Sequence, residues 1–243
     1  MGNLLKLTIS GASNACFIAG RGGVGKTYSA EKILDEGGLS DGDGYFLNKG
    51  SISAAGLYAS LFEHKDTILV FDDADDVFKD QTSRNLLKGA TDTSPVRKLN
   101  WNKMGSNVVD PDEMSDAEIL DSGKIPKYFN FTGKIIFISN LKMDQLDPDG
   151  ALRTRGFMIS IDPTDEEVYD FMDKIVDNMK LKPGLYLSLE DRKYVVKLLR
   201  EGTSKQTANL RKLKRGLNML AGARKAGVNV ADKELERMIS LYA

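Results

Sequence analysis

The stretch that decides the fold is Ala15-Cys16-Phe17-Ile18-Ala19-Gly20-Arg21-Gly22-Gly23-Val24-Gly25-Lys26-Thr27. From Gly20 to Thr27 it matches the pattern G-x-x-x-x-G-K-[ST] in full, between an apolar run and an expected helix. Glycines let backbone N–H groups turn inward around phosphates, and the start of a helix adds partial positive charge. The sequence therefore predicts a phosphate-binding loop formed by Gly20, Arg21, Gly22, Gly23, Val24, Gly25, Lys26 and Thr27. In this loop Lys26 reaches the β- and γ-phosphates, and the Thr27 hydroxyl ligates Mg²⁺.

Other short apolar runs predict the sheet to which this loop is attached. Ile68-Leu69-Val70-Phe71 and Ile135-Ile136-Phe137-Ile138 show no polar alternation, which is typical of strands buried on both faces of a parallel sheet. Weaker strand candidates are 45–47 and 157–159, and helical stretches are expected at about 26–36, 53–64 and 81–90. Strands that alternate with helices imply right-handed crossovers and three layers. We expect an α/β core over residues 1–162, with a five-stranded parallel sheet.

The character of the chain changes after Asp162-Pro163. Residues 164–243 contain no strand-like run, and apolar residues recur at helical spacing in 166–179, 189–201, 207–224 and 231–241. Thr164 precedes three acidic residues and is expected to cap the first of these helices. We therefore expect residues 163–243 to form a small all-α domain.

The segment 91–133 is too long for a simple connection between two core elements. It holds a basic and aromatic piece at 96–103 and an acidic piece at 110–121, and we expect a hairpin with a partly mobile acidic loop or short helix. Trp101 with Arg97, Lys98 and Lys103 suits a pore loop that grips a nucleic-acid strand or a polypeptide. A single Trp in a hairpin is equally consistent with a core residue, so both interpretations stay open.

Composition limits the classes of function. The chain has 243 residues, 34 Lys and Arg, 35 Asp and Glu, and a net charge of −1, which excludes a globally basic nucleic-acid binder but not a local basic face. One Cys and one His exclude an internal disulfide and a His-based metal site. The longest apolar runs are about five residues, far short of a membrane helix. We expect a soluble protein of the cytoplasm that has no membrane partner.

Two carboxylates end the second strong strand candidate. Asp72 and Asp73 follow Phe71 directly, and in P-loop proteins a carboxylate at this place holds the Mg²⁺ shell. We assign that role to Asp72, and we expect Asp73 to orient and polarise an attacking water. A solvated turn at the strand end is the alternative, since Asp75 and Asp76 follow closely.

With these motifs the chain resembles the AAA+ ATPases over nearly its whole length. The family has a five-stranded parallel sheet with a helical lid, and its fourth strand, between the strands of the two Walker motifs, ends in a polar sensor. Ile135 to Asn140 looks like that strand, which implies Asn140 as sensor 1. The stretch from Asp147 to Gly156 looks like the segment whose last arginine reaches the neighbouring subunit's nucleotide, which implies Arg155, with Arg153 second. Asn209 to Leu213 resembles the sensor 2 helix, which implies that Arg211 contacts the γ-phosphate in cis.

The resemblance implies that ATP and Mg²⁺ bind at interfaces of a homo-oligomer, with hydrolysis remodelling or moving a nucleic acid or a protein. The assembly would be a ring, expected to be a hexamer, or a filament. The compact arrangement resembles small AAA+ proteins of phages and mobile elements, and a phage protein would work in the host cytoplasm. The family usually has Glu where Asp73 stands. The shorter Asp73 side chain leaves open a slow hydrolase, such as a DNA-bound switch or loader.

Two further interpretations remain at this point. A small-molecule or nucleotide kinase shares the P-loop core, but the series of sensor residues would then be unexplained. Seven basic residues and no acid lie between Lys205 and Lys225, which fits either a nucleic-acid-facing stripe or a solvated helix face. Lys212, Lys214 and Lys225 are the phosphate contacts that we expect in the first case.

Overall fold

The computed structural model describes residues 1–103, 105, 107–201 and 207–241. The chain divides into two compact units: unit 1 is Met1–Arg21 with Lys26–Ile161, and unit 2 is Gly22–Gly25 with Asp162–Ala243. Half of the phosphate-binding loop, Gly22 to Gly25, therefore groups with unit 2, although the residues on both sides of it belong to unit 1.

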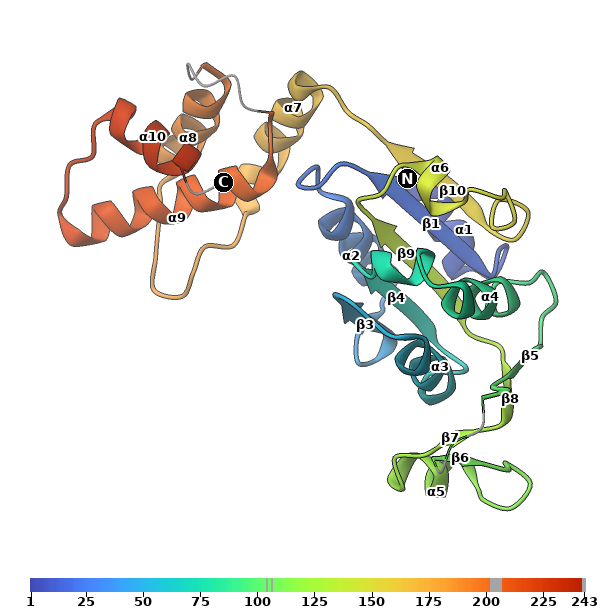
Figure 1. The fold of residues 1–243 in the computed structure, drawn as a ribbon. Helices are drawn as coiled ribbons and strands as arrows, with labels where there is room; N and C mark the ends of the chain where they lie inside the picture. The colour runs from blue at the N-terminus through green and yellow to red at the C-terminus, as the bar shows by residue number, and fades with distance from the viewer. Residues whose placement is uncertain (104, 106, 202–206, 242–243) are drawn as a thin grey trace. The chain divides into compact units, whose positions relative to one another are not determined.

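A parallel sheet forms the centre of unit 1 (Figure 1). Its order is β10-β1-β9-β4-β3-β2, and every neighbouring pair is parallel. The strands are β1 (Ala15–Gly20), β2 (Ser40–Asp41), β3 (Gly44–Lys49), β4 (Ile68–Asp72), β9 (Lys134–Ser139) and β10 (Phe157–Ile161). The expected count of five strands was one too low, because β2 is two exposed residues long and leaves no apolar run in the sequence.

Helices cover both faces of this sheet, which explains why its central strands show no polar alternation. Phe17, Phe71 and Phe137 point to the face covered by α3 (Ala54–Glu63) and α4 (Gln81–Ala90). On the other face, residues such as Ile18 and Ile136 pack with α2 (Lys26–Glu36) and with α1 (Gly2–Ile9), a helix that the sequence analysis did not predict. Cys16 lies on this second face, where burial raises the pKa of its thiol to about 12.

The segment 91–133 packs onto the α3 and α4 side of unit 1. Strand β5 (Arg97–Asn100) pairs antiparallel with β8 (Tyr128–Phe131), and β6 (Val108–Val109) pairs in parallel with β7 (Ile125–Pro126). The expected short acidic helix is present as α5 (Asp116–Asp121), with a capping box at its start. The expected hairpin is replaced by a pairing between strands that lie far apart in the chain.

Of the two interpretations of this segment, the structure favours the core one for Trp101 and Arg97. Trp101 is only 8% exposed, and its ring lies 5.2 Å from that of Tyr58 on α3. The buried Arg97 guanidinium donates to backbone carbonyls of Ala90 (3.1 Å) and Pro95 (2.9 Å), and it lies over the Phe131 ring. Neither side chain can therefore grip a substrate without opening the core.

Four α-helices make up the described part of unit 2. They are α7 (Asp165–Ile175), α8 (Leu189–Glu201), α9 (Leu210–Ala226) and α10 (Asp232–Leu241), and a short 3-10 helix η2 (Val176–Asn178) follows α7. Thr164 caps α7 as expected, through a capping box with Glu167. A Cβ on Gly216 in α9 would lie 2.7 Å from Ile239 and 2.8 Å from Val195, so this glycine permits close contact with α10 and α8. Lys205, counted in the basic run, lies outside the described residues.

In the described part of the chain, no helix combines the length and apolarity that crossing a membrane requires.

Candidate functional site

The predicted site residues of unit 1 meet at the carboxyl edge of its sheet. Strand β9 lies between β1 and β4 and pairs with both, so the residues that follow these three strands emerge side by side. The phosphate-binding loop follows β1, Asp72 ends β4 with Asp73 directly after it, and Asn140 follows β9. At the start of the loop, Gly20 has φ 150°, and a Cβ there would lie 2.0 Å from the Ile161 carbonyl oxygen. Only glycine fits this junction of loop and sheet.

The Lys26 ammonium is bound by three oxygen atoms. Its Nζ donates to the carbonyl oxygens of Gly20 (2.6 Å) and Arg21 (2.9 Å) and to Oδ1 of Asn140 (2.9 Å). The side chain is buried at the first position of α2. These contacts place a positive charge at the base of the loop, where the motif expects one.

Thr27 and Asp72 form the second contact of the site. The Thr27 hydroxyl lies 3.1 Å and 3.0 Å from Oδ1 and Oδ2 of Asp72, within hydrogen-bond distance of both oxygens. Asp72 is 8% exposed, and this burial raises the pKa of its carboxyl. The Thr27 hydrogen bond opposes that rise and the neighbouring Asp73 charge adds to it. A buried carboxylate beside a hydroxyl supplies oxygen ligands of the kind that Mg²⁺ prefers.

Asp73 occupies an unusual backbone conformation. It is the residue other than glycine in the described chain that has a positive φ, 59°, and its N–H donates to the Ile138 carbonyl at 3.2 Å. Aspartate and asparagine tolerate this left-handed region better than most other residues. Its carboxylate accepts a hydrogen bond from Nδ2 of Asn140. The amide of Asn140 therefore joins Asp73 to Lys26, one contact through each of its two polar atoms.

A supporting contact at the same edge was missed by the sequence analysis. The Ser139 hydroxyl donates to Oδ1 of Asp75 at 2.6 Å and accepts the Leu141 N–H at 3.0 Å. It thereby fixes the end of β9 to the turn after β4. Asp75 is thus engaged with Ser139, which leaves Asp73 as the carboxylate that contacts Asn140. The signal available in the sequence was the Ser-Asn pair at the end of the strand.

The tip of the loop contacts the start of α9 within unit 2. The Gly23 carbonyl accepts the N–H of Leu210, the first residue of α9, at 2.8 Å. The side chain of Asn209 caps this helix by accepting the N–H of Arg211 at 2.8 Å. Arg211 therefore stands in the first turn of a helix that begins against the phosphate-binding loop. This contact could not be predicted from the sequence, because Gly23 and Leu210 are far apart in the chain.

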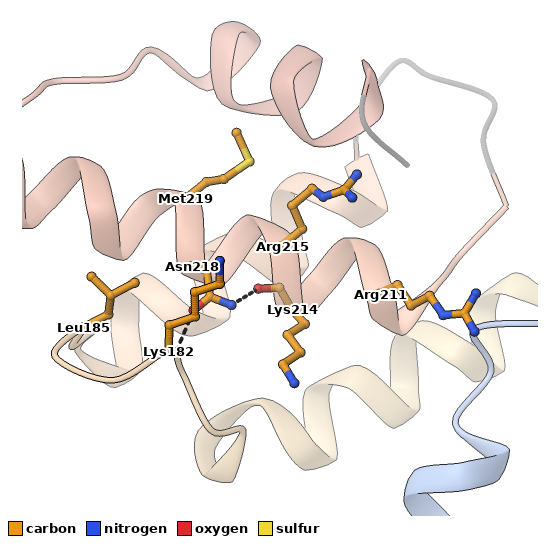
Figure 2. Close-up of a pocket in the computed structure, with 7 residues that line it drawn as sticks. All are labelled: Lys182, Leu185, Arg211, Lys214, Arg215, Asn218 and Met219. Carbon is orange, nitrogen blue, oxygen red and sulfur yellow. Dashed lines mark hydrogen bonds between the residues drawn. The ribbon is translucent and has the colours of Figure 1, made fainter. Parts of the chain in front are cut away.

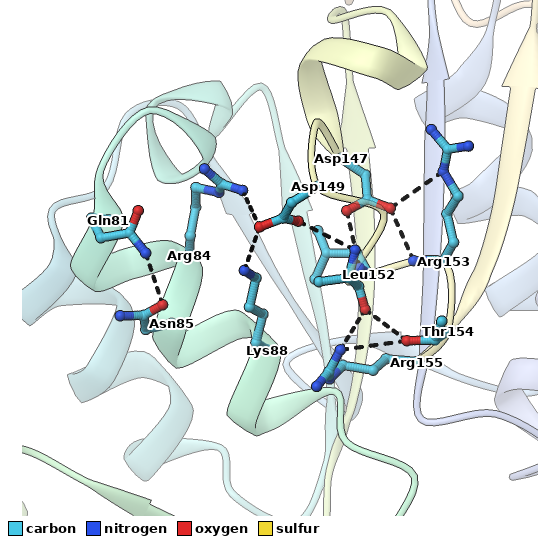
Figure 3. Close-up of polar contacts among 11 residues, drawn as sticks. Gln81, Arg84, Asn85, Lys88, Asp147, Asp149, Leu152, Arg153, Thr154 and Arg155 are labelled. Atoms are coloured by element: carbon cyan, nitrogen blue, oxygen red, sulfur yellow. Dashed lines mark hydrogen bonds and ion pairs between the residues drawn. The ribbon is translucent and has the colours of Figure 1, made fainter.

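The arginine segment before β10 is organised by a buried carboxylate (Figure 3). Asp147 follows the short helix α6 (Met143–Leu146) and accepts the N–H groups of Leu152 and Arg153, both at 3.0 Å. Arg153 is 55% exposed at its side chain, and its Nε lies 3.4 Å from Asp147. Arg155 is half-buried, and its guanidinium donates to the Ala151 carbonyl at 2.6 Å. Arg155 and Arg153 thus differ in exposure, and the structure describes neither in contact with the residues around Lys26.

A second charged cluster holds this segment to α4. Asp149 accepts from Arg84 at 2.8 Å and from Lys88 at 2.6 Å (Figure 3). The Lys88 hydrogen bond, the Ala151 N–H and the nearby positive charges lower the pKa of the Asp149 carboxyl to about 2. Asp147 and Asp149 were not predicted as site residues. They belong to Asp147-Pro148-Asp149-Gly150, a sequence typical of a turn, which does not tell which carboxylate is buried.

Comparison with known proteins places this geometry in a wider context. No protein-family model matches the chain. An uncharacterised 36.7 kDa protein from the nrdC-mobD intergenic region of Enterobacteria phage T4 is 34% identical over 150 residues, which are 60% of this chain and 41% of the T4 protein. The chain therefore spans about two fifths of the length of that relative.

Solved structures resemble the chain more completely than the T4 sequence does. Domain III of the Thermotoga maritima replication initiation protein DnaA has a TM-score of 0.52 at 16% identity, covering 99% of this chain and 90% of that domain. A mutant of Thermotoga maritima RuvB also has a TM-score of 0.52, at 13% identity, covering 99% of this chain and 67% of RuvB. Both are AAA+ P-loop ATPases, so the fold of this chain resembles AAA+ ATPase domains.

Proposed function

We propose that this protein is an AAA+ ATPase that binds and hydrolyses Mg²⁺-ATP at subunit interfaces to remodel or move a macromolecular substrate. The observation that carries the proposal is the link Lys26–Asn140–Asp73 at the sheet edge. It connects the lysine of a phosphate-binding loop, a sensor amide and a carboxylate in one chain of contacts. Each of these three groups has a separate role in phosphoryl transfer to water.

The residues present fit a magnesium ion that is shared with the nucleotide. In the described part of the chain no group of three His, Cys, Asp or Glu side chains could hold a metal alone. Mg²⁺ typically takes one or two protein ligands together with substrate phosphates and waters, which is what Thr27 and Asp72 can supply. When bound, the ion would neutralise charge on the β- and γ-phosphates.

The protein's own groups then divide the reaction between them. Lys26 offsets the charge of the β- and γ-phosphates, and the loop N–H groups orient them. Asp73 accepts a proton from a water aligned with the γ-phosphate, while Asn140 holds the Asp73 carboxylate in place. Arg211 senses the γ-phosphate from α9, and unit 2 acts as the lid. The contact between Gly23 and Leu210 supports this role, because it ties the start of α9 to the loop.

A neighbouring subunit would complete the site. We assign Arg155 to the nucleotide of the next subunit, with Arg153 as the second candidate, because a guanidinium stays charged and matches the γ-phosphate. Arg153 is 55% exposed, whereas Arg155 would have to release the Ala151 carbonyl to reach a partner. The assembly is a ring or a filament of identical chains, and the relationship to a phage T4 protein supports a place in a host cytoplasm.

Phosphate release from ATP tests this function directly. The intact protein should release inorganic phosphate in the presence of Mg²⁺, and activity per subunit should rise with protein concentration. Thr27→Ala should raise the Mg²⁺ concentration that gives half the activity, because one metal ligand is lost. Thin-layer analysis of labelled γ-phosphate that shows a phosphorylated product in place of free phosphate would indicate a kinase and contradict the proposal.

A slow nucleotide switch is the second candidate, and the backbone of Asp73 favours it. The left-handed φ of 59° at position 73 is tolerated by aspartate. A glutamate there would reach further but would strain the backbone. A carboxylate one methylene short of its water is expected to slow hydrolysis. In this version ATP drives assembly on DNA, as a switch or loader, and hydrolysis only resets it. Stable ATP-dependent assemblies with turnover slower than about one per minute would support the switch over the motor.

A further inference from the structure

Unit 2 has a basic pocket of which the ATPase proposal uses Arg211 alone. The pocket has a volume of about 490 Å³ and lies between α9 and the loop that joins η2 to α8 (Figure 2). Its lining consists of Lys182, Leu185, Arg211, Lys214, Arg215, Asn218 and Met219. Four of these seven residues are cationic and none is acidic, so the pocket suits an anion.

The helical repeat explains why the cations gather there. Arg211, Lys214, Arg215 and Asn218 are spaced by three and four residues, which puts them on one face of α9. Lys182 approaches that face from the loop. Arg211 stands in the first turn of α9, beside the contact with the phosphate-binding loop. We therefore assign Arg211 to nucleotide binding and not to the ligand of this pocket. Lys214 and Arg215, further along the helix, and Lys182 of the loop then remain.

The loop is fixed in place by side chains of α8 and α9. Asn218 accepts the Lys182 N–H at 2.8 Å and donates to the Lys214 carbonyl at 2.7 Å. Lys225 donates to the Gly184 carbonyl at 3.2 Å, and Arg192 donates to the Met179 carbonyl at 2.8 Å. The loop therefore forms a fixed wall of the pocket. Asn218 holds the Lys182 backbone in position.

Among the side chains that the structure describes, the pocket cations lack the carboxylate partners that other arginines of unit 2 have. Arg200 pairs with Asp170 and Asp173, and Arg224 pairs with Asp191. Among the described residues, by contrast, no carboxylate lies within ion-pair distance of any of the four pocket cations. Such a cluster costs self-repulsion, which a bound polyanion would relieve.

An exposed aromatic ring stands in the same loop. Tyr186 follows the pocket residue Leu185 directly and is 81% exposed, more than any other large apolar or aromatic side chain of the described chain. A tyrosine ring left in water has apolar faces available for stacking. Cations that contact a phosphate backbone, next to a ring on which a base can stack, are the two components of single-strand recognition.

We infer that this pocket binds single-stranded nucleic acid. Lys182, Lys214 and Arg215 contact consecutive phosphates, and Tyr186 stacks on an unpaired base. Lys212 and Lys225, which the sequence led us to expect as phosphate contacts, make contacts within the protein instead. Lys225 holds the loop, and Lys212 is half-buried, with Nζ 3.4 Å from the Thr207 carbonyl.

Binding of fluorescent oligonucleotides to the full chain without nucleotide tests the inference separately from the ATPase. An oligo-dT strand, an abasic strand of equal length and a duplex are the three probes. The double variant Lys214→Gln, Arg215→Gln should weaken binding of both single strands about tenfold at low salt, and it should reduce the salt slope by about 1.4. Tyr186→Ala should weaken oligo-dT binding about fivefold or more, and it should leave abasic binding nearly unchanged.

Matched variants separate a site from general charge. The double variant Lys174→Gln, Lys193→Gln removes the same charge from exposed positions of α7 and α8, and it should change oligo-dT affinity less than twofold. Tyr186→Phe keeps the ring and should bind like the intact protein.

Three results would overturn the inference. The first is no oligo-dT binding by the intact protein at low salt. The second is an equal loss in the α7 and α8 control. The third is tighter duplex binding that is insensitive to Tyr186→Ala, which would indicate a backbone-only duplex surface. Because Lys26→Ala should retain oligo-dT binding, failure of the ATPase proposal would leave this result unaffected.

Discussion

At the scale of single residues, Asn140 is the position on which the account depends most. Its amide oxygen accepts from Lys26 and its amide nitrogen donates to Asp73, so the two ends of one side chain contact opposite charges. Neither a carboxylate nor an apolar side chain can make both contacts. The order of the sheet makes this possible, because β9 lies between the strands that carry the two partners.

Asp73 is expected to contribute to hydrolysis and not to binding. Asp73→Asn keeps a side chain that tolerates the left-handed backbone, but it cannot take a proton from water. Phosphate release should fall by about 10²-fold or more, while ATP affinity measured by calorimetry stays within about threefold. Unchanged phosphate release would move the catalytic role away from Asp73.

The charged Asp72 carboxylate is expected to lower the stability of the folded protein when no metal is bound, and to provide a ligand when Mg²⁺ binds. Its pKa in the folded protein is raised by burial, so the charged form destabilises the fold at any pH above that pKa. The destabilisation disappears as pH falls through the raised pKa, because the carboxyl is then protonated. Asp72→Asn should therefore raise the unfolding midpoint at neutral pH without nucleotide, by roughly 2 to 4 °C per kcal/mol, and the gain should vanish in acid.

Thermal scans with and without Mg²⁺-ATP check the second half of this prediction. Mg²⁺-ATP should stabilise the intact protein and should stabilise Asp72→Asn much less, because binding to the folded state alone raises the midpoint. Equal stabilisation of the two proteins would remove Asp72 from the metal site.

At the scale of elements, the carboxylate under the arginine segment is the most sensitive position. Asp147 is buried and accepts two backbone N–H groups, so Asp147→Ala leaves both without their partner. We expect a loss of about 2 to 4 kcal/mol in the free energy of unfolding, measured by urea titration. Asp149→Ala is the control, because the Asp149 side chain is 45% exposed where that of Asp147 is buried, and its loss should be smaller. Equal losses would contradict the structural role of Asp147.

The sequence predicted elements best where hydrophobic runs are long and buried on both faces. The strands at Ala15, Ile68 and Ile135 and the helix that follows Lys26 are all present. It missed β2 because two exposed residues leave no pattern, and it missed α1 because this eight-residue helix has no capping side chain to mark its start.

Site residues on strand ends could be predicted because parallel order brings those ends together. Contacts formed by tertiary packing could not be predicted in this way. The burial of Trp101 against Tyr58 and the contact of Gly23 with Leu210 depend on segments that are distant in sequence. The left-handed conformation of Asp73 likewise has no signature in the residue type, because most aspartates do not adopt it.

At the scale of the whole molecule, Arg155 tests assembly and catalysis together. If it acts on the next subunit, Arg155→Ala should bind ATP normally and lose about 10³-fold in rate. Mixing Arg155→Ala with Lys26→Ala subunits should restore part of the activity, because some interfaces then join an intact loop to an intact arginine. No rescue in mixtures shown by mass measurement to co-assemble would exclude Arg155 and leave Arg153, which should be tested in the same way.

The central claim is that Gly20 to Thr27 forms the nucleotide site, and calorimetric titration of Mg²⁺-ATP into the intact protein and into Lys26→Ala tests it most directly. Circular dichroism of both proteins controls for folding, because Lys26 also contacts Gly20 and Asn140. We predict saturable binding to the intact protein and no detectable binding to a folded Lys26→Ala variant, since the Lys26 charge that faces the β- and γ-phosphates is lost. ATP binding of equal affinity to both proteins would contradict the account.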